Sequence, residues 1–125
     1  MKKILVVDDS TTFASLLELL FGKEFEVHKA HDGVEGLQTA IQVLPDLILL
    51  DVMMPRLNGI EVLRQLQAIR QTSNIPVIIL TAQQFEPRME KILQREPNVA
   101  FFLNKSCGVG MLLNKVEEVL NGPGK

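Results

Sequence analysis

The chain has 125 residues, about the length of one average domain, and 46% hydrophobic with 22% charged residues is typical of a globular chain rather than a disordered one. Thirteen basic and fifteen acidic residues give a net charge of -2, which argues against direct nucleic-acid binding. The single cysteine, Cys107, excludes an internal disulfide and a four-cysteine zinc site and favours a cytoplasmic location.

Short apolar runs predict the strands of a sheet, in chain order. The first run, residues 4–7, follows two lysines but ends in two aspartates after only four residues, so we reject an export signal. Residues 47–50, 77–80 and 99–103 are similar runs, which are typical of parallel strands covered by helices on both faces. Residues 26–31 alternate instead, which predicts an edge strand with one face in water. No run approaches the ~18 residues of a membrane span, so membrane insertion is not expected.

Apolar residues at helical spacing lie between these runs and predict five helices. Their stripes are Phe13, Leu16, Leu17, Leu20 and Phe21; Val34, Leu37, Ile41 and Leu44; Val62, Leu63, Leu66 and Ile69; Met89, Ile92 and Leu93; and Val109, Leu112, Leu113, Val116, Val119 and Leu120. Pro45 ends the second helix, Pro87 suits the first turn of the fourth, and residues 121–123 stop the fifth.

This strand–helix alternation predicts a doubly wound α/β fold in a single domain, residues 1–125, with an ordered core of about 2–121. We expect a flavodoxin-like (βα)5 three-layer sandwich with a parallel five-stranded sheet of order 2-1-3-4-5.

Polar residues follow the strands at the edge of the sheet where such folds bind ligands. Strand 1 is followed by Asp8 and Asp9, strand 3 by Asp51, strand 4 by Thr81 and strand 5 by Lys105. Three carboxylates this close repel by several kcal/mol per pair at an effective dielectric constant near 20, and a divalent cation relieves that repulsion. Oxygen ligands without a nearby cysteine or histidine favour Mg²⁺ over zinc, with Mn²⁺ as a substitute.

Each of these residues also has a purely structural interpretation. The sequence from Asp8 to Thr11 suits a helix N-cap, Asp51 suits a loop, Thr81 suits the cap of the fourth helix, and Lys105 suits a solvated surface position. These interpretations explain the residues singly, but not their convergence on one edge of the sheet.

Four motifs across nearly the whole chain carry a family resemblance: Val7-Asp8-Asp9-Ser10, Asp51-Val52-Met53-Met54-Pro55 followed by Asn58-Gly59, Leu80-Thr81-Ala82, and Lys105. This pattern resembles the receiver domain of bacterial two-component response regulators, of the single-domain chemotaxis type.

The resemblance implies that Asp51 accepts a phosphoryl group from a phosphohistidine of a sensor histidine kinase or phosphotransfer protein. It also implies that Asp9, Asp51 and the backbone carbonyl of Met53 bind Mg²⁺ directly, and that Asp8 reaches the ion through water. The resemblance implies a signalling switch and not an enzyme, since the chain would catalyse only the phosphorylation and dephosphorylation of its own aspartate.

In the family, the remaining site residues bind the phosphoryl group or change conformation when it is present. Lys105 and Thr81 are the implied ligands of phosphoryl oxygens, and Phe102 is the implied switch aromatic that moves inward as Thr81 turns.

The expected output surface is the face formed by helix 4, strand 5 and helix 5. This face carries mixed charges, which suit a downstream protein target or a weak homodimer. The residues are Arg88, Lys91, Gln94, Arg95, Lys115 and Glu118.

Three positions differ from, or vary within, the family pattern. Ser106 stands where a proline with a cis bond is usual, and because a cis bond to a non-proline residue costs about 2.5–4 kcal/mol we expect the Lys105–Ser106 bond to be trans. Met53 and Gln83 occupy the two variable positions that control access to the phosphoryl group, and methionine cannot orient an attacking water.

Other functions remain open on the same architecture. A receiver-like binding module without phosphorylation is supported by Ser106 alone. A flavodoxin-like electron carrier needs a phosphate-binding Ser/Thr/Gly loop where this chain has two aspartates, and the chain has neither Trp nor Tyr to sandwich a flavin ring. A Mg²⁺-dependent phosphatase with an aspartyl nucleophile needs an acid where Met53 stands.

Overall fold

A computed structural model describes residues 1–52, 59–81 and 87–122 of the chain. Five parallel strands form one sheet of order β2-β1-β3-β4-β5, as predicted. The strands are β1 (Lys3–Val7), β2 (Glu26–Ala30), β3 (Leu47–Leu50), β4 (Val77–Thr81) and β5 (Val99–Asn104). Each boundary lies within one residue of its prediction, because continuous Val, Ile and Leu runs suit a strand buried on both faces.

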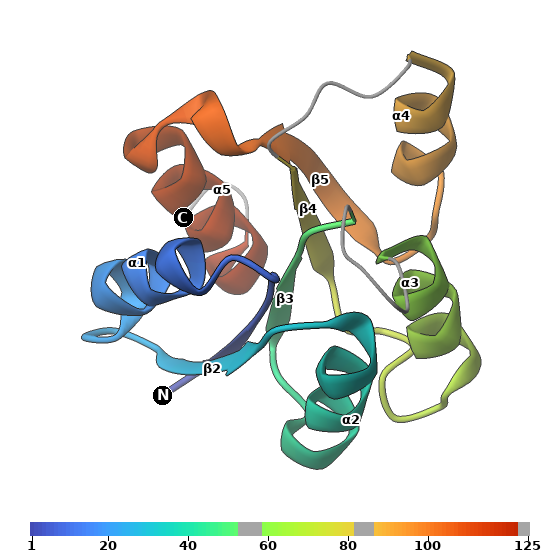
Figure 1. Cartoon of the computed structure of the whole chain (residues 1–125), viewed down its shortest axis with the longest axis horizontal. Coiled ribbons are helices and arrows are strands. Elements are labelled where there is room, and N and C mark those ends of the chain that lie inside the picture. Colours follow the sequence, from blue (N-terminus) through green and yellow to red (C-terminus); the bar gives the residue numbers. More distant parts are fainter. Residues whose placement is uncertain (53–58, 82–86, 123–125) are drawn as a thin grey trace.

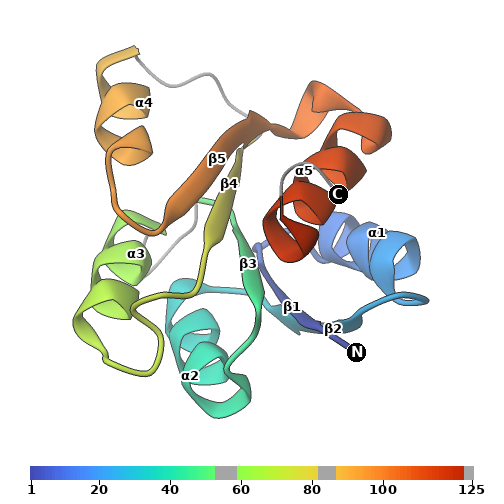
Figure 2. The ribbon, with the colours of Figure 1, turned by 180° about the vertical axis from the view of Figure 1, so that it is seen from behind.

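Helices cover both faces of the sheet (Figure 1). They are α1 (Thr11–Phe21), α2 (Gly33–Val43), α3 (Gly59–Ala68), α4 (Pro87–Gln94) and α5 (Val109–Asn121), with a short 3₁₀ helix, η1 (Lys105–Cys107), before α5. The opposite view in Figure 2 shows α1 and α5 together on one face, with α2 and α3 on the other and α4 beside the β5 edge. Within the described residues, no helix is both long and apolar enough to cross a bilayer.

The sheet separates two hydrophobic cores. Successive residues of β1 alternate between them: Ile4 and Val6 pack with α1 and α5, while Leu5 and Val7 pack toward α2 and α3. The outer strands are less buried than the inner ones. The run 99–103, expected to be covered on both faces, is mostly half-buried because β5 forms the second edge of the sheet.

The predicted core face of α2 is only partly correct. Leu37 is half-buried and packs against the core, but Val34 and Ile41 are exposed, whereas Gly36 and Ala40 face the sheet. A Cβ atom built on Gly36 would lie 2.7 Å from Cγ1 of Val7, so α2 runs too close to β1 for a larger side chain. The helix therefore packs through its small residues, and Leu44 just beyond its end is also exposed.

The predicted stripes of three further helices are too wide. Leu16, Ile92, Val109 and Leu113 are exposed, although each belongs to a predicted stripe. The buried line of α1 runs instead through Ala14, Leu17 and Phe21. In α5 the buried residues are Leu112, Val116 and Leu120. These helices contact the sheet along one narrow line of residues, so the flanking apolar positions stay in water.

Candidate functional site

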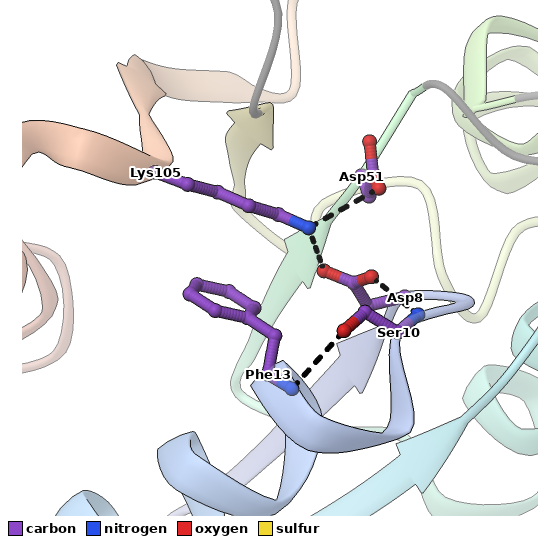
Figure 3. A network of polar contacts seen from close by, with 5 residues as sticks. All are labelled: Asp8, Ser10, Phe13, Asp51 and Lys105. Atoms are coloured by element: carbon purple, nitrogen blue, oxygen red, sulfur yellow. Dashed lines mark hydrogen bonds and ion pairs between the residues drawn. The ribbon is translucent and has the colours of Figure 1, made fainter.

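The acidic pair follows β1 directly. The backbone N–H of Asp8 donates to the carbonyl of Ala30 at 3.0 Å, which continues the pairing with β2 and buries the Asp8 side chain. The neighbouring Asp9 is exposed. Oδ1 of Asp8 accepts from the N–H of Ser10 at 2.8 Å, and Oγ of Ser10 accepts from the N–H of Phe13 at 3.2 Å (Figure 3). Ser10 is thus the N-cap of α1. The segment therefore both caps the helix and contributes carboxylates to the acidic cluster.

Asp51 follows β3, the strand next to β1. Its N–H donates to the carbonyl of Val7 at 2.9 Å, and its side chain is buried. One carboxylate oxygen from each of Asp8, Asp9 and Asp51 lies within 4.8 Å of the others. The predicted convergence of the three acids is confirmed, and their oxygens form a set that suits a hard divalent cation.

Lys105 reaches this cluster from the end of β5. Its ammonium lies 2.7 Å from Oδ2 of Asp8 and 3.4 Å from Oδ2 of Asp51, and its side chain is only 15% exposed. The interpretation of Lys105 as a solvated surface residue is therefore wrong. Burial alone would lower the pKa of Lys105, but the hydrogen bond that its ammonium donates to Asp8 and the charges of Asp8 and Asp51 raise the pKa above its ordinary value of 10.5.

The aromatic ring of Phe13 is a further contact of Lys105. The ammonium lies 4.4 Å from the ring centroid, within the range of a cation–π interaction. Phe13 belongs to the apolar stripe predicted for the first helix, and nothing in the sequence connects it with the site. No local signal predicts this contact, because it depends on how the end of β5 lies beside the first turn of α1.

Thr81 is the buried last residue of β4. It pairs with Asn104, and Ile79 pairs with Phe102 two residues earlier, so Thr81 and the half-buried Phe102 lie on the same face of adjacent strands. The described part of α4 begins at Pro87 and Thr81 is a strand residue, so the described residues give no support to Thr81 as the cap of this helix.

The turn after β5 contains the residue that departs from the family pattern. The Lys105–Ser106 bond is trans, as predicted, since no peptide bond in the described part of the chain is cis. Oδ1 of Asn104 accepts hydrogen bonds from both the N–H and the hydroxyl of Ser106, at 2.9 and 2.8 Å. A proline at this position would supply neither of these donors.

Asp8 and Asp9 differ in how freely their carboxylate oxygens can bind a metal ion. Both oxygens of Asp8 already accept hydrogen bonds or pair with Lys105, whereas Asp9 is exposed at the mouth of the cluster. The residues present therefore fit a Mg²⁺ ion held mainly by Asp9 and Asp51. Met53 and Gln83 lie outside the described residues, so their predicted roles stay predictions.

Comparison with known proteins identifies the family of this chain. The sequence model of the response regulator receiver domain matches residues 4–117. The chain belongs to this receiver domain family. Such receiver domains act as signalling switches of two-component systems and interact with histidine kinases or phosphotransfer proteins. The family match therefore agrees with the fold and with the acidic cluster described above.

Several relatives align with this receiver domain over nearly its whole length. It is 37% identical over 123 residues to Protein PilH of Pseudomonas aeruginosa, covering 98% of this chain and 100% of that protein. It is 41% identical over 121 residues to the transcriptional regulatory protein CpxR of Escherichia coli, covering 96% of this chain but only 50% of CpxR. It spans 7% of a hybrid signal transduction histidine kinase D of Dictyostelium discoideum, at 36% identity over 94% of this chain.

A solved structure supports the same fold. The chemotaxis protein CheY4 of Vibrio cholerae superposes with a TM-score of 0.85 at 29% identity, over 96% of this chain and 99% of that chain. The predicted family and fold are therefore confirmed.

Proposed function

We propose that Asp51 accepts a phosphoryl group from a phosphohistidine of a sensor histidine kinase or phosphotransfer protein, and that the modified domain regulates a protein partner. The observation that carries the proposal is the buried Asp51 carboxylate, which shares one crevice with Asp8, Asp9 and the ammonium of Lys105. We propose no reaction for this chain other than the formation and hydrolysis of its own aspartyl phosphate.

The proposed transfer exchanges one bond to phosphorus for another. A carboxylate oxygen of Asp51 attacks the phosphorus atom while the bond to the imidazole nitrogen breaks. The nitrogen keeps the electron pair of that bond and takes up a proton, so the histidine leaves as neutral imidazole. Such transfers need positioning and charge neutralisation more than covalent help. Lys105 can neutralise one phosphoryl oxygen, and the hydroxyl of Thr81 can donate to another.

A divalent cation completes the proposed site. Three carboxylates face one ammonium among the described residues, so their charge is not balanced by Lys105 alone. Mg²⁺, or Mn²⁺ in its place, would neutralise a phosphoryl oxygen and the excess charge when bound. Asp9 and Asp51 would hold the ion directly, together with the backbone carbonyl of Met53, and Asp8 would act through water.

The proposed output begins at Thr81 and Phe102. Because these residues lie on the same face of adjacent strands, a turn of Thr81 toward the phosphoryl group vacates space that the Phe102 ring can fill. The neighbouring face of α4, β5 and α5 carries exposed Arg88, Lys91, Gln94 and Arg95. From α5, Lys115 and Glu118 are half-buried and pair with each other at 3.5 Å. This mixed surface supports a protein target or a weak homodimer over a polyanion.

Phosphorylation by a small-molecule donor tests the proposal. The wild-type protein, incubated with acetyl phosphate and Mg²⁺, should gain the mass of one phosphoryl group, and the gain should disappear when the metal is chelated. The Asp51→Asn variant, matched in size, should gain nothing. A wild-type protein that stays unmodified would favour the binding module without phosphorylation, and equal labelling of Asp51→Asn would exclude Asp51 as the acceptor.

A further inference from the structure

We propose that Phe13 is a positioning residue for phosphoryl transfer, because its ring holds the ammonium of Lys105 over the acidic cluster. The inference rests on the proposed role of Asp51 as phosphoacceptor. It adds to that role a group that touches neither the phosphoryl donor nor a metal. Phe13 acts through Lys105, whose ammonium contacts Asp8, Asp51 and the Phe13 ring among the described residues.

The geometry gives the ring a definite task. Lys105 ends in a compact charge on a flexible four-carbon chain, and an ion pair with Asp8 alone would leave that chain several rotamers. The electron-rich face of Phe13 attracts the ammonium from another direction, with 4.4 Å between Nζ and the ring centroid. Figure 3 shows the lysine side chain running past the Phe13 ring and ending with its ammonium beside Asp8 and Asp51. The ring therefore narrows the positions that the ammonium can take before the phosphoryl group arrives.

The start of α1 fixes the ring and the principal carboxylate partner together. Asp8 accepts from the N–H of Ser10, and the Ser10 hydroxyl oxygen accepts from the N–H of Phe13. One N-cap thus joins the carboxylate and the backbone of the aromatic residue that contact Lys105. The carboxylate of Asp8 and the backbone that carries the Phe13 ring are therefore linked through Ser10, which suits a positioning role.

Packing is the alternative role of Phe13. The ring also lines a small apolar groove of about 100 Å³ between α1 and α5, beside Leu16 and Leu112. A residue that only fills this groove could be replaced by leucine without effect on Lys105. A residue that holds the ammonium needs an aromatic face. The two roles are separated by variants that keep or remove the ring at similar apolar volume.

The first measurement is the initial rate of Asp51 phosphorylation by acetyl phosphate with Mg²⁺. Phe13→Leu should lower the rate about three- to tenfold, which corresponds to about 0.6–1.4 kcal/mol and lies within the range of cation–π contacts. Phe13→Tyr keeps the ring and should restore most of the rate. Leu16→Ala, on the same helix and groove, is the control and should leave the rate unchanged. Equal rates in Phe13→Leu and wild type would overturn the proposal.

A double-mutant cycle tests whether the effect passes through Lys105. In a Lys105→Met background, Phe13→Leu should cause no further loss, because there is no ammonium left to hold. The same fold-loss in both backgrounds would show that Phe13 acts by packing alone.

The NMR signals of the Lys105 ε-methylene protons test the contact without any reaction. Ring currents should shift these signals upfield in the wild type and in Phe13→Tyr, and Phe13→Leu should abolish the shift. A wild-type protein without this shift lacks the contact, and the inference then fails. If the wild type shows the shift but takes no phosphoryl group, the contact stands and the proposed function is what fails.

Discussion

The ammonium of Lys105 lies 2.7 Å from Oδ2 of Asp8, and the side chains are only 15% and 3% exposed. This pair is shorter than the 3.4 Å contact between Lys105 and Asp51. The other oxygen of Asp8 accepts from the N–H of Ser10, so both oxygens of this carboxylate have donors. Asp8 therefore organises the crevice, while the exposed Asp9 is the acid best placed to give an oxygen to an ion.

We expect Asp9→Asn to weaken Mg²⁺ binding more than Asp8→Asn does. Loss of a direct carboxylate ligand should lower the affinity more than about tenfold, whereas a contact made through water contributes less. Isothermal titration of Mg²⁺ into the two variants and the wild type measures this difference. Equal affinities in the two variants would refute the division into a direct and a water-mediated ligand.

The stability contributed by Lys105 should disappear at alkaline pH. Burial opposes the charged ammonium, yet the Asp8 hydrogen bond and the nearby carboxylates raise the pKa of Lys105 above 10.5 in the folded protein. A raised pKa means that the folded state holds this proton more tightly, so the contribution is complete below the unfolded pKa and is lost as pH rises through the folded one. Lys105→Met should therefore lower the free energy of unfolding by about 1–3 kcal/mol near neutral pH.

Urea unfolding of wild type and Lys105→Met across this range checks the prediction. The difference between the two proteins should hold steady up to about pH 10 and shrink above it. The absence of tyrosine from the chain simplifies the comparison, and Lys23→Met, at an exposed lysine, controls for general alkaline effects. A difference that grows with pH would contradict the sign of the pKa shift.

Gly59 should not tolerate a side chain. A Cβ atom there would overlap Cα of Val52, the residue that follows Asp51, because α3 begins against this backbone. We expect Gly59→Ala to lower the free energy of unfolding by about 1–3 kcal/mol. Gly110→Ala is the matched control in α5, where a Cβ meets nothing within 4 Å, and it should be neutral or stabilising by up to about 1 kcal/mol. Similar urea midpoints for the two variants would contradict this prediction.

Much of the fold could be predicted from the sequence because buried parallel strands are continuous apolar runs. The helices were harder, since an apolar stripe shows which residues avoid water but not how closely a helix approaches the sheet. Gly36 and Val7 show the problem: their close contact turns α2 to a small-residue face and leaves Ile41 exposed. The spacing of apolar residues within α2 does not show how closely this helix lies to β1.

The acids and Lys105 of the site could be predicted because each follows the end of a strand, and strand order places those ends together. Phe13 could not be assigned to the site in this way, because its position relative to Lys105 depends on packing between α1 and the turn after β5. The sequence predicts the trans Lys105–Ser106 peptide bond, but not the hydrogen bonds that Ser106 donates to Asn104. Contacts between side chains of different elements need the assembled fold.

Phosphorylation should change the environment of α4 and β5. We expect amide NMR signals of Thr81, Phe102 and residues 87–94 to shift when beryllofluoride, a phosphoryl mimic, is added with Mg²⁺. The underlying coupling should be about 1–3 kcal/mol, as in other conformational switches, so both conformations should be populated. Asp51→Asn serves as the control and should show no such shifts. Changes confined to the ends of β1 and β3 would show that this face is not the output.

The most direct measurement is the chemical location of the phosphoryl group. An aspartyl phosphate is reduced by borohydride to homoserine, which tandem mass spectrometry of proteolytic peptides locates. After incubation with acetyl phosphate and Mg²⁺, we predict homoserine at position 51 and unmodified aspartate at positions 8 and 9. Homoserine at position 8 or 9 would contradict the assignment of Asp51 as the phosphoacceptor. The absence of homoserine from all three positions would contradict it as well.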